Sequence, residues 1–269
     1  MPAFTSRSVE RSWGQMRVWE SGAGPPILAV HGLGGSGRYW QGLADRLGGR
    51  WSIVAPDLPG FGRSSPPGPG VDRAFLLREL EAVAPPGPLV VVGHSLGGIL
   101  AALWVGAHAE RTRGLAIAAS PYPSGTGLDP RSRADLRPSL VRRAVSGGVR
   151  AIWPVIALPA GLLRGYPPQV VADFGRQSVQ SRAWTMWALL SDPEAPGAVA
   201  QGVRLPQDLP VILAFAADDR TVRPASVARW RATIPQARFR SVPSGGHQFL
   251  LRTGFEPISG WLGELPSVP

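Results

Sequence analysis

The sequence contains no cysteine, no lysine and no asparagine. The lack of cysteine excludes disulfide bonds and thiolate metal sites, and it leaves the redox compartment open. The lack of lysine means that all 28 basic side chains are arginines, which with 18 acidic residues give a formal net charge of +10. Because lysine and asparagine codons are rich in A and T, both absences fit a GC-rich genome. Without interleaved basic and aromatic residues, the charge is therefore no sign of a nucleic-acid partner.

Long apolar segments are also scarce. The one long uncharged run covers residues 88–109, and it contains a proline, four glycines and two histidines. A buried strand followed by a buried helix explains this run better than a membrane span, which needs about 20 predominantly apolar residues. Residues 1–13 contain three charged side chains and no apolar core, unlike a secretory signal. We therefore expect a cytoplasmic protein that does not insert stably into membranes.

The most informative stretch lies inside this run. Residues 89–92 are apolar and mostly β-branched, which is typical of a buried parallel strand, and residues 99–107 show the pattern of an apolar helix. Between them stands G-x-S-x-G, at Gly93, Ser95 and Gly97. Glycines around a serine let the chain turn sharply from strand to helix, so that the hydroxyl stands at the positive end of the helix. The pattern predicts that Ser95 is a nucleophile.

A serine nucleophile needs a base, and the chain has four histidines. His247 follows two glycines on a loop after the last predicted strand, at the sheet edge where ligands bind, and we expect it to act as the base. We expect His31, at the start of a glycine-rich loop, to hold that loop by hydrogen bonding. His94, beside the serine, is expected to point away from the site into packing, and His108 to lie on the surface.

The base in turn needs a carboxylate that fixes its tautomer. Asp218 and Asp219 both follow the predicted strand 211–216; we choose Asp219, and Asp218 remains the alternative. Asp57 also ends a strand, but it precedes the serine and lies in a proline-rich loop, which we expect it to hold.

The order Ser95, Asp219, His247 is the one that accompanies a serine in a strand–turn–helix motif. In such a site, backbone N–H groups stabilise the negative oxygen of the tetrahedral intermediate. We expect these N–H groups to belong to Leu96, directly after the serine, and to Leu33 in the glycine-rich loop.

Strand and helix patterns alternate through the first 120 residues, which favours an α/β fold with a parallel sheet covered on both faces. From residue 121 to about 209 there is no clear strand, and the alternation returns at residue 211. We predict a core domain of residues 1–120 and 210–269, with a helical cap, residues 121–209, inserted between two strands. The predicted strands are residues 13–20, 27–30, 51–55, 89–92, 115–118, 211–216 and 238–242, and the predicted helices are residues 39–47, 74–84, 99–107, 134–145, 149–163, 169–180, 182–190, 224–234 and 256–262.

These motifs together resemble the α/β-hydrolase superfamily over nearly the whole chain. The resemblance is carried by residues 31–35 (HGLGG), 56–64 (PDLPGFGRS), 93–98 (GHSLGG), 219–224 (DRTVRP) and 246–247 (GH). It implies an eight-stranded, mostly parallel sheet with a cap inserted after the sixth strand, and esterase-like or lipase-like activity without a metal or cofactor. The serine differs from the aspartate that haloalkane dehalogenases and epoxide hydrolases carry there. Gln248, in place of a tryptophan after His247, argues against the meta-cleavage product hydrolases.

Aromatic residues of the cap predict the kind of substrate. Trp153, Tyr166, Trp184 and Trp187, together with Phe249 behind the histidine, are expected to line an apolar pocket; the alternative is that they pack cap helices onto the core. We predict a serine hydrolase that cleaves a hydrophobic carboxylic ester, lactone or thioester through an acyl-enzyme. The alternative is an enzyme of natural-product or aromatic metabolism that uses the same residues for C–C bond cleavage, cyclisation or cofactor-free perhydrolysis.

Arginines are also concentrated in the cap. The simplest interpretation is a solvated face, and the alternative is a docking surface for an acidic acyl carrier protein or an anionic substrate. These residues are Arg131, Arg133, Arg137, Arg142, Arg143 and Arg150.

Overall fold

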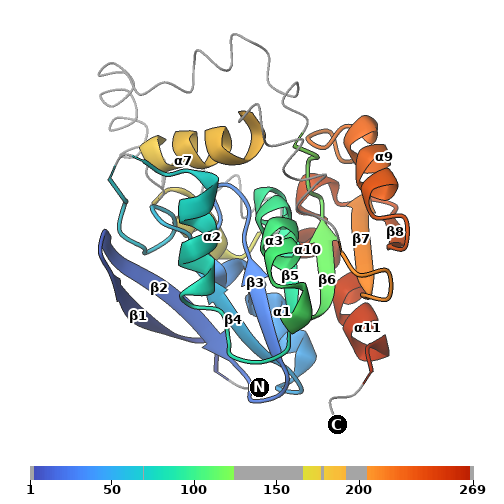
Figure 1. Cartoon of the computed structure of the whole chain (residues 1–269), viewed down its shortest axis with the longest axis horizontal. Coiled ribbons are helices and arrows are strands. Elements are labelled where there is room, and N and C mark those ends of the chain that lie inside the picture. The colour runs from blue at the N-terminus through green and yellow to red at the C-terminus, as the bar shows by residue number, and fades with distance from the viewer. Residues whose placement is uncertain (1–2, 69, 124–165, 177–178, 192–204, 267–269) are drawn as a thin grey trace.

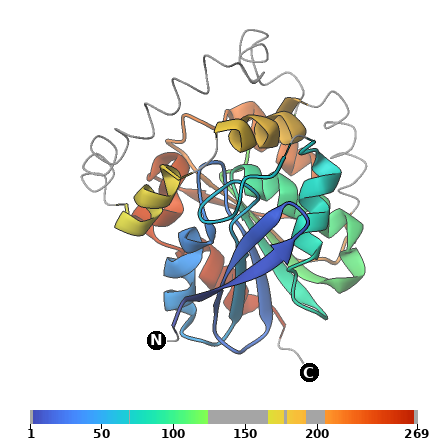
Figure 2. The same ribbon diagram turned by 90° about the vertical axis from the view of Figure 1, so that its left-hand side faces the viewer.

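The computed structural model describes residues 3–68, 70–123, 166–176, 179–191 and 205–266. The strands are β1 (Thr5–Arg11), β2 (Gly14–Ser21), β3 (Pro26–Val30), β4 (Ser52–Pro56), β5 (Leu89–His94), β6 (Thr112–Ala118), β7 (Val211–Ala216) and β8 (Arg238–Val242). They form an eight-stranded sheet in the order β1-β2-β4-β3-β5-β6-β7-β8 (Figures 1 and 2). Strand β2 pairs antiparallel with β1 and β4, and the other neighbouring strands are parallel. The predicted α/β class and mostly parallel sheet are confirmed.

Helices cover both faces of the sheet (Figure 1). One face packs against α2, α3 and α9, whose Leu80, Leu100 and Trp230 are buried in one apolar cluster. The other face packs against α1, α10 and α11, whose Leu43, Leu250 and other apolar side chains belong to a second cluster. The helices are α1 (Gln41–Leu47), α2 (Arg73–Glu81), α3 (Leu96–Ala107), α9 (Pro224–Thr233), α10 (Phe249–Thr253) and α11 (Glu256–Glu264), with short 3-10 turns η1 (Gly37–Trp40), η2 (Ala109–Arg111) and η4 (Gly246–Gln248). Because helices cover both faces of the sheet, the central strands carry apolar side chains on both sides.

The long uncharged run of residues 88–109 divides, as predicted, into a strand and a helix. All six residues of β5 are buried, and so are residues 96–105 of α3. Their place in the middle of the sheet accounts for the apolar composition. No helix in the described part of the chain is long and apolar enough to cross a membrane.

The N-terminal side of the sheet differs from the prediction. The predicted strand of residues 13–20 corresponds to β2, which lies inside the sheet, and the edge is formed by β1, which is not among the predicted strands. Strand β1 reads T-S-R-S-V-E-R and is mostly exposed, so it lacks the apolar alternation that marks a strand in a sequence. Its charged side chains suit an edge, because they discourage pairing with other chains.

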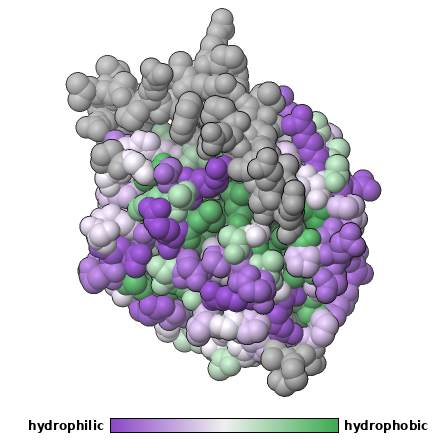
Figure 3. All heavy atoms as spheres, in the orientation of Figure 1, coloured by the Kyte–Doolittle hydropathy of each residue, from purple (hydrophilic) through white to green (hydrophobic). Residues whose placement is uncertain are grey.

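The structure describes three helical pieces of residues 121–209, which join β6 to β7. They are α6 (Pro168–Phe174), α7 (Val179–Met186) and a π-helical turn, η3 (Trp187–Ser191). In Figures 1 and 2, α7 lies over the ends of α2 and α3, and Figure 3 shows apolar atoms surrounded by polar ones on the face below it. The predicted helices 134–145 and 149–163 lie outside the described residues.

Candidate active site

Ser95 stands at the turn between β5 and α3, in a strained backbone conformation. Its φ of 55° and ψ of −126° lie in a region that residues other than glycine rarely adopt. The turn is tight: a Cβ on Gly93 would lie 2.3 Å from the carbonyl oxygen of Gly97, and a Cβ on Gly97 would lie 2.3 Å from that of Val30. Both glycines are therefore required. Ser120 secures the turn by donating a 2.8 Å hydrogen bond from its hydroxyl to the carbonyl oxygen of Ser95.

Three side chains from distant parts of the sequence meet at this turn. The hydroxyl oxygen of Ser95 lies 2.9 Å from Nε2 of His247. Nδ1 of the same ring lies 3.0 Å from Oδ2 of Asp219. His247 belongs to η4, after β8, and Asp219 follows β7, so both side chains approach from the carboxyl ends of neighbouring parallel strands. With a carboxylate at Nδ1, that nitrogen carries the proton and Nε2 accepts from the serine hydroxyl.

The carboxylate of Asp219 is held by more than the histidine. It also accepts hydrogen bonds from the backbone N–H groups of Thr221, at 2.7 Å, and Val222, at 3.1 Å. Burial by itself raises the pKa of Asp219, but the hydrogen bond and charge of His247 and these two N–H groups outweigh burial and hold the pKa below its usual value. The carboxyl group is therefore ionised at neutral pH.

Asp218, the alternative carboxylate, has different partners. It accepts hydrogen bonds from the N–H groups of Gly245, at 3.2 Å, and Gly246, at 2.8 Å. These glycines begin the loop that carries His247. Asp219 thus contacts the ring of His247, whereas Asp218 holds the backbone of the two glycines that precede His247.

His94, next to the serine, contacts the backbone of the other histidine. Its Nε2–H donates a 2.9 Å hydrogen bond to the carbonyl oxygen of His247, and its ring stacks on Tyr39 with 4.7 Å between ring centres. Burial, followed by the neighbouring charge of His247, lowers the pKa of His94 to about 3, so the ring is neutral and has a single N–H. The ring of His94 is packed, as expected, and it differs from the expectation in contacting the loop that carries His247.

The residues predicted to supply the backbone N–H groups belong to two segments next to the serine turn. Leu96 is the first residue of α3, so its N–H has no helical carbonyl partner one turn earlier. Leu33 belongs to the glycine-rich loop 31–35, which runs against the serine: a Cβ on Gly32 would lie 2.8 Å from the Cβ of Ser95. The structure therefore places the glycine-rich loop and the first turn of α3 next to Ser95.

Two buried side chains hold the neighbouring loops, as predicted. His31 donates from Nδ1 to the carbonyl oxygen of the next residue, at 2.7 Å, and accepts at Nε2 from the N–H of Leu58, at 2.9 Å. Burial lowers the pKa of His31 to about 4, so this ring is neutral as well. Asp57 accepts from the N–H groups of Gly37, at 2.6 Å, and Arg63, at 2.7 Å, and burial raises its pKa to about 6.

The predicted pocket residues are placed in part. Trp184 is half-buried on α7 and packs, like Leu33, against the apolar cluster of α2, α3 and α9. Tyr166 is half-buried just before α6. Phe249 is fully buried among core residues of α1 and α11, so its predicted place in the pocket is corrected. Outside the described residues lie Trp153, the side chain of Trp187, Arg131, Arg133, Arg137, Arg142, Arg143 and Arg150.

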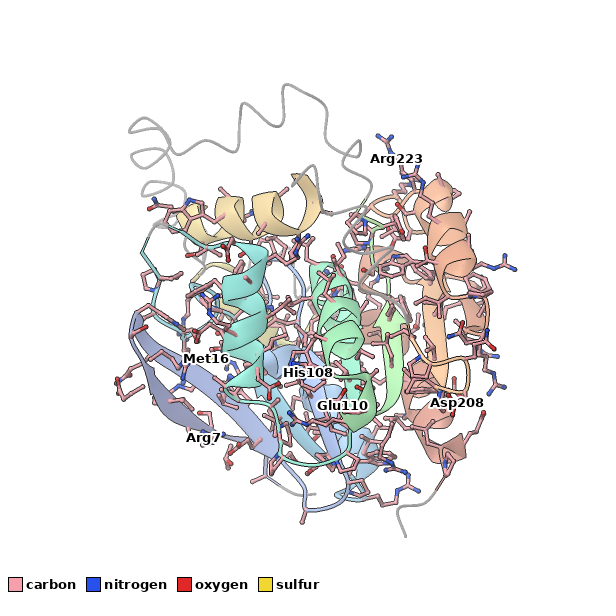
Figure 4. All side chains as sticks on the ribbon, in the orientation of Figure 1. Arg7, Met16, His108, Glu110, Asp208 and Arg223 are labelled. Carbon is pink, nitrogen blue, oxygen red and sulfur yellow. The ribbon has the colours of Figure 1, made fainter. Side chains whose placement is uncertain are left out.

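His108 lies away from this site. Figure 4 shows it beside Glu110 at the end of α3 opposite to the serine turn. Its ring centre lies 4.4 Å from that of Trp104, and its Nε2 lies 3.4 Å from a carboxylate oxygen of Glu81. It is therefore packed against a neighbour instead of lying free on the surface.

Comparisons with known proteins agree on the fold. A family model described as alpha/beta hydrolase fold matches residues 25–252. The chain is 37% identical over 99 residues to a pimeloyl-[acyl-carrier protein] methyl ester esterase from Chromobacterium violaceum. The aligned segment covers 37% of this chain and 38% of that protein. The chain is also 27% identical over 262 residues to a 2-(acetamidomethylene)succinate hydrolase from Mesorhizobium japonicum, and this alignment covers 91% of this chain and 89% of that protein. The chain spans 24% to 40% of the length of the first curated relatives that it matches.

A solved structure with the same architecture is the thioesterase domain from the curacin biosynthetic pathway. It matches with a TM-score of 0.73 at 20% identity, covering 97% of this chain and 99% of that domain. At this identity the likeness shows the fold alone.

Proposed function

The chain belongs to the alpha/beta hydrolase fold family, and from this premise we propose that it is a serine hydrolase that cleaves a carboxylic ester, lactone or thioester through an acyl-enzyme. One observation carries the proposal: hydrogen-bond distances of 2.9 Å and 3.0 Å link Ser95 through His247 to Asp219. A serine, a base and an orienting carboxylate in this arrangement form a nucleophile activated for acyl transfer.

In the first half-reaction, Oγ of Ser95 attacks the carbonyl carbon of the substrate. Nε2 of His247 takes the hydroxyl proton, and the carboxylate of Asp219 stabilises the resulting imidazolium through Nδ1–H. The carbonyl oxygen becomes an oxyanion, which accepts hydrogen bonds from the N–H groups of Leu33 and Leu96. A donor of this kind typically contributes about 2.7–4 kcal/mol to the transition state.

The tetrahedral intermediate then collapses. The bond between the carbonyl carbon and the alcohol or thiol breaks, and the leaving group takes the proton from Nε2 of His247. In the second half-reaction, a water molecule gives a proton to the same nitrogen and attacks the acyl carbon. The second intermediate releases the carboxylic acid, and the proton returns to Oγ of Ser95.

The acyl group is proposed to be hydrophobic. Trp184 on α7 and Leu33 of the glycine-rich loop are partly buried apolar side chains that pack against the same cluster, and on this basis we propose that apolar side chains of the inserted segment and of the core receive the acyl group. Tyr166, Trp153 and Trp187 complete this proposed pocket. The relatives named as a methyl ester esterase and a hydrolase are consistent with hydrolysis of an acyl bond.

Delivery of the acyl group by an acidic acyl carrier protein is the second part of the proposal. Residues 220–252, which follow Asp219 and run past His247, contain seven arginines and no acidic residue, and all seven arginines are exposed. Figure 4 shows Arg223 projecting at the end of α9. The relative from Chromobacterium violaceum is named for such a carrier. The arginines are Arg220, Arg223, Arg229, Arg231, Arg238, Arg240 and Arg252.

The test of the chemistry is a pre-steady-state assay with p-nitrophenyl esters of increasing acyl length. We expect a stoichiometric burst in the wild type that is lost in Ser95→Ala and kept in Ser8→Ala, a control at an exposed serine of β1. Equal turnover of acetyl and long or aromatic esters would contradict the apolar pocket. No turnover, together with no reaction with a serine-directed phosphonate, would contradict the mechanism and favour C–C cleavage, cyclisation or perhydrolysis.

The test of the partner compares an acyl carrier thioester with the same acyl group on a small thiol. We expect a higher kcat/KM for the carrier substrate, and we expect added salt to reduce only that advantage, because salt screens exposed charges. A carrier substrate that reacts no faster than the small thioester would contradict this part alone.

A further inference from the structure

Asp173, on α6, is an ionisable side chain with no exposed surface, and the mechanism above does not use it. Its carboxylate accepts a 2.7 Å hydrogen bond from the hydroxyl of Ser36 and a 2.6 Å hydrogen bond from Nε of Arg38. Nη2 of Arg38 donates to the other carboxylate oxygen, and Nη1 of Arg176 lies 3.5 Å from it. A buried carboxylate is costly unless it is paired and hydrogen-bonded in this way, so the arrangement permits little movement.

The partners of this carboxylate directly follow the glycine-rich loop 31–35. Through Ser36 and Arg38 the carboxylate ties α6 to the chain just beyond the loop. The next residue of α6, Phe174, contacts the loop itself: a Cβ on Gly34 would lie 2.3 Å from its ring. Helix α6 therefore fixes the loop on both sides of Gly35.

The opposite end of the same loop touches the serine turn. Gly32 has so little space that a Cβ there would lie 2.8 Å from the Cβ of Ser95. In the sequence, Leu33, whose N–H is the proposed oxyanion donor, lies between Gly32, which contacts Ser95, and Gly34, which contacts Phe174. The position of the Leu33 N–H relative to the serine hydroxyl thus depends on where α6 holds the loop.

We propose that Asp173 is a positioning residue, which through Ser36 and Arg38 fixes the loop whose Leu33 N–H stabilises the oxyanion. This inference rests on the proposed function. It assigns the inserted segment a part in the reaction itself, because α6 belongs to that segment. A misplacement of about 1 Å in an active site can cost about 10²-fold in rate, and complete loss of an oxyanion donor costs about 10²–10³-fold in kcat. We therefore expect a loss of kcat of about 10- to 100-fold without Asp173.

The experiment compares Asp173→Asn, Ser36→Ala and a matched control, Glu79→Gln. Glu79 is also a buried carboxylate, and it pairs with Arg11 at 2.7 Å between β1 and α2, away from the loop. We expect Asp173→Asn to lower kcat for a p-nitrophenyl ester with little change in KM, and Ser36→Ala to have a smaller effect in the same direction. Glu79→Gln is expected to keep kcat. Thermal unfolding of all three variants measures what each substitution costs in Tm.

A thiono ester, in which sulfur replaces the carbonyl oxygen, gives the specific readout. N–H groups placed for an oxyanion stabilise the larger sulfur poorly, so the wild type is expected to prefer the oxygen ester. Asp173→Asn and Ser36→Ala are expected to reduce this preference, because they slow the oxygen ester much more than the thiono ester. Glu79→Gln is expected to leave the preference unchanged.

Two results would contradict the positioning role of Asp173 without contradicting the proposed function. One is a wild-type burst that depends on Ser95 together with an unchanged kcat in Asp173→Asn. The other is an equal loss on both esters in Asp173→Asn and Ser36→Ala, which would indicate general destabilisation. The absence of any Ser95-dependent burst in the wild type would instead refute the proposed function, and this inference with it.

Discussion

The hydrogen bond from His94 to the backbone of His247 leads to a direct test of how the proposed base, His247, is held. The substitution His94→Phe keeps an aromatic ring that can stack on Tyr39, but it removes the N–H that donates to the carbonyl oxygen of His247. The substitution His94→Gln keeps an N–H at a similar distance from the backbone. Because burial and the nearby His247 lower the pKa of His94 to about 3, neither substitution removes a charge near neutral pH.

The expected magnitude follows from the loss of one buried hydrogen bond. An acceptor left without a donor in the interior costs about 1–3 kcal/mol. At 1.36 kcal/mol per factor of ten, this corresponds to a loss of about 5- to 150-fold in kcat if the whole cost appears in the transition state. Asp219 still holds the ring of His247 from the other side, at 3.0 Å, so we expect a value toward the lower end.

The assay is steady-state ester hydrolysis over a range of pH, with thermal unfolding of each variant as a control. We expect His94→Phe to lower kcat more than His94→Gln, with similar KM values. The pH dependence of both variants should retain its shape, because His94 is neutral in the wild type. A His94→Phe enzyme as active as His94→Gln would show that this N–H does not position the ring of His247.

Two further predictions concern pH and the carboxylates. Stability to denaturant should fall as pH decreases below 6.5, because the buried His31 and His94, with pKa values of about 4 and about 3, take up protons only in the unfolded chain. Asp57, whose pKa is raised to about 6, acts in the opposite direction, because the folded protein keeps a proton on this carboxyl that the unfolded chain releases. Near pH 5 the unfolded chain therefore binds about one proton more than the folded protein, and the free energy of unfolding should fall by roughly 1.4 kcal/mol for each pH unit of acidification. A free energy of unfolding that does not change with pH would contradict this prediction. Asp219→Asn should lower kcat by about 10⁴-fold and Asp218→Asn far less, and equal losses in steady-state assays would mean that the wrong carboxylate has been chosen.

Features that depend on short stretches of sequence could be predicted. Strand β7 has the predicted bounds because its six residues are apolar and buried. The serine turn could be predicted because only glycine fits at Gly93 and Gly97. The structure brings Ser95, Asp219 and His247 together, as the sequence suggested, because each follows a strand of one parallel sheet and the carboxyl ends of such strands share an edge.

Features that depend on polar contacts between distant segments could not be predicted. His94 and His247 are 153 residues apart, and Arg38 and Asp173 are 135 residues apart. No periodicity or motif links such pairs, because a polar side chain at one position says nothing about which distant group folding will place beside it. Strand β1 could not be predicted either, because its exposed, polar residues show no alternation of apolar and polar side chains.

We propose that the reaction passes through an acyl-enzyme on Ser95. The most direct test is to mix the protein with a slowly turned-over ester, quench with acid at successive times, and locate added mass by peptide mapping. We expect the acyl group on the peptide that contains Ser95, rising and then decaying as the carboxylic acid appears, and we expect no adduct in Ser95→Ala. Formation of the acid without any adduct on Ser95 would mean that no acyl-enzyme forms on this serine.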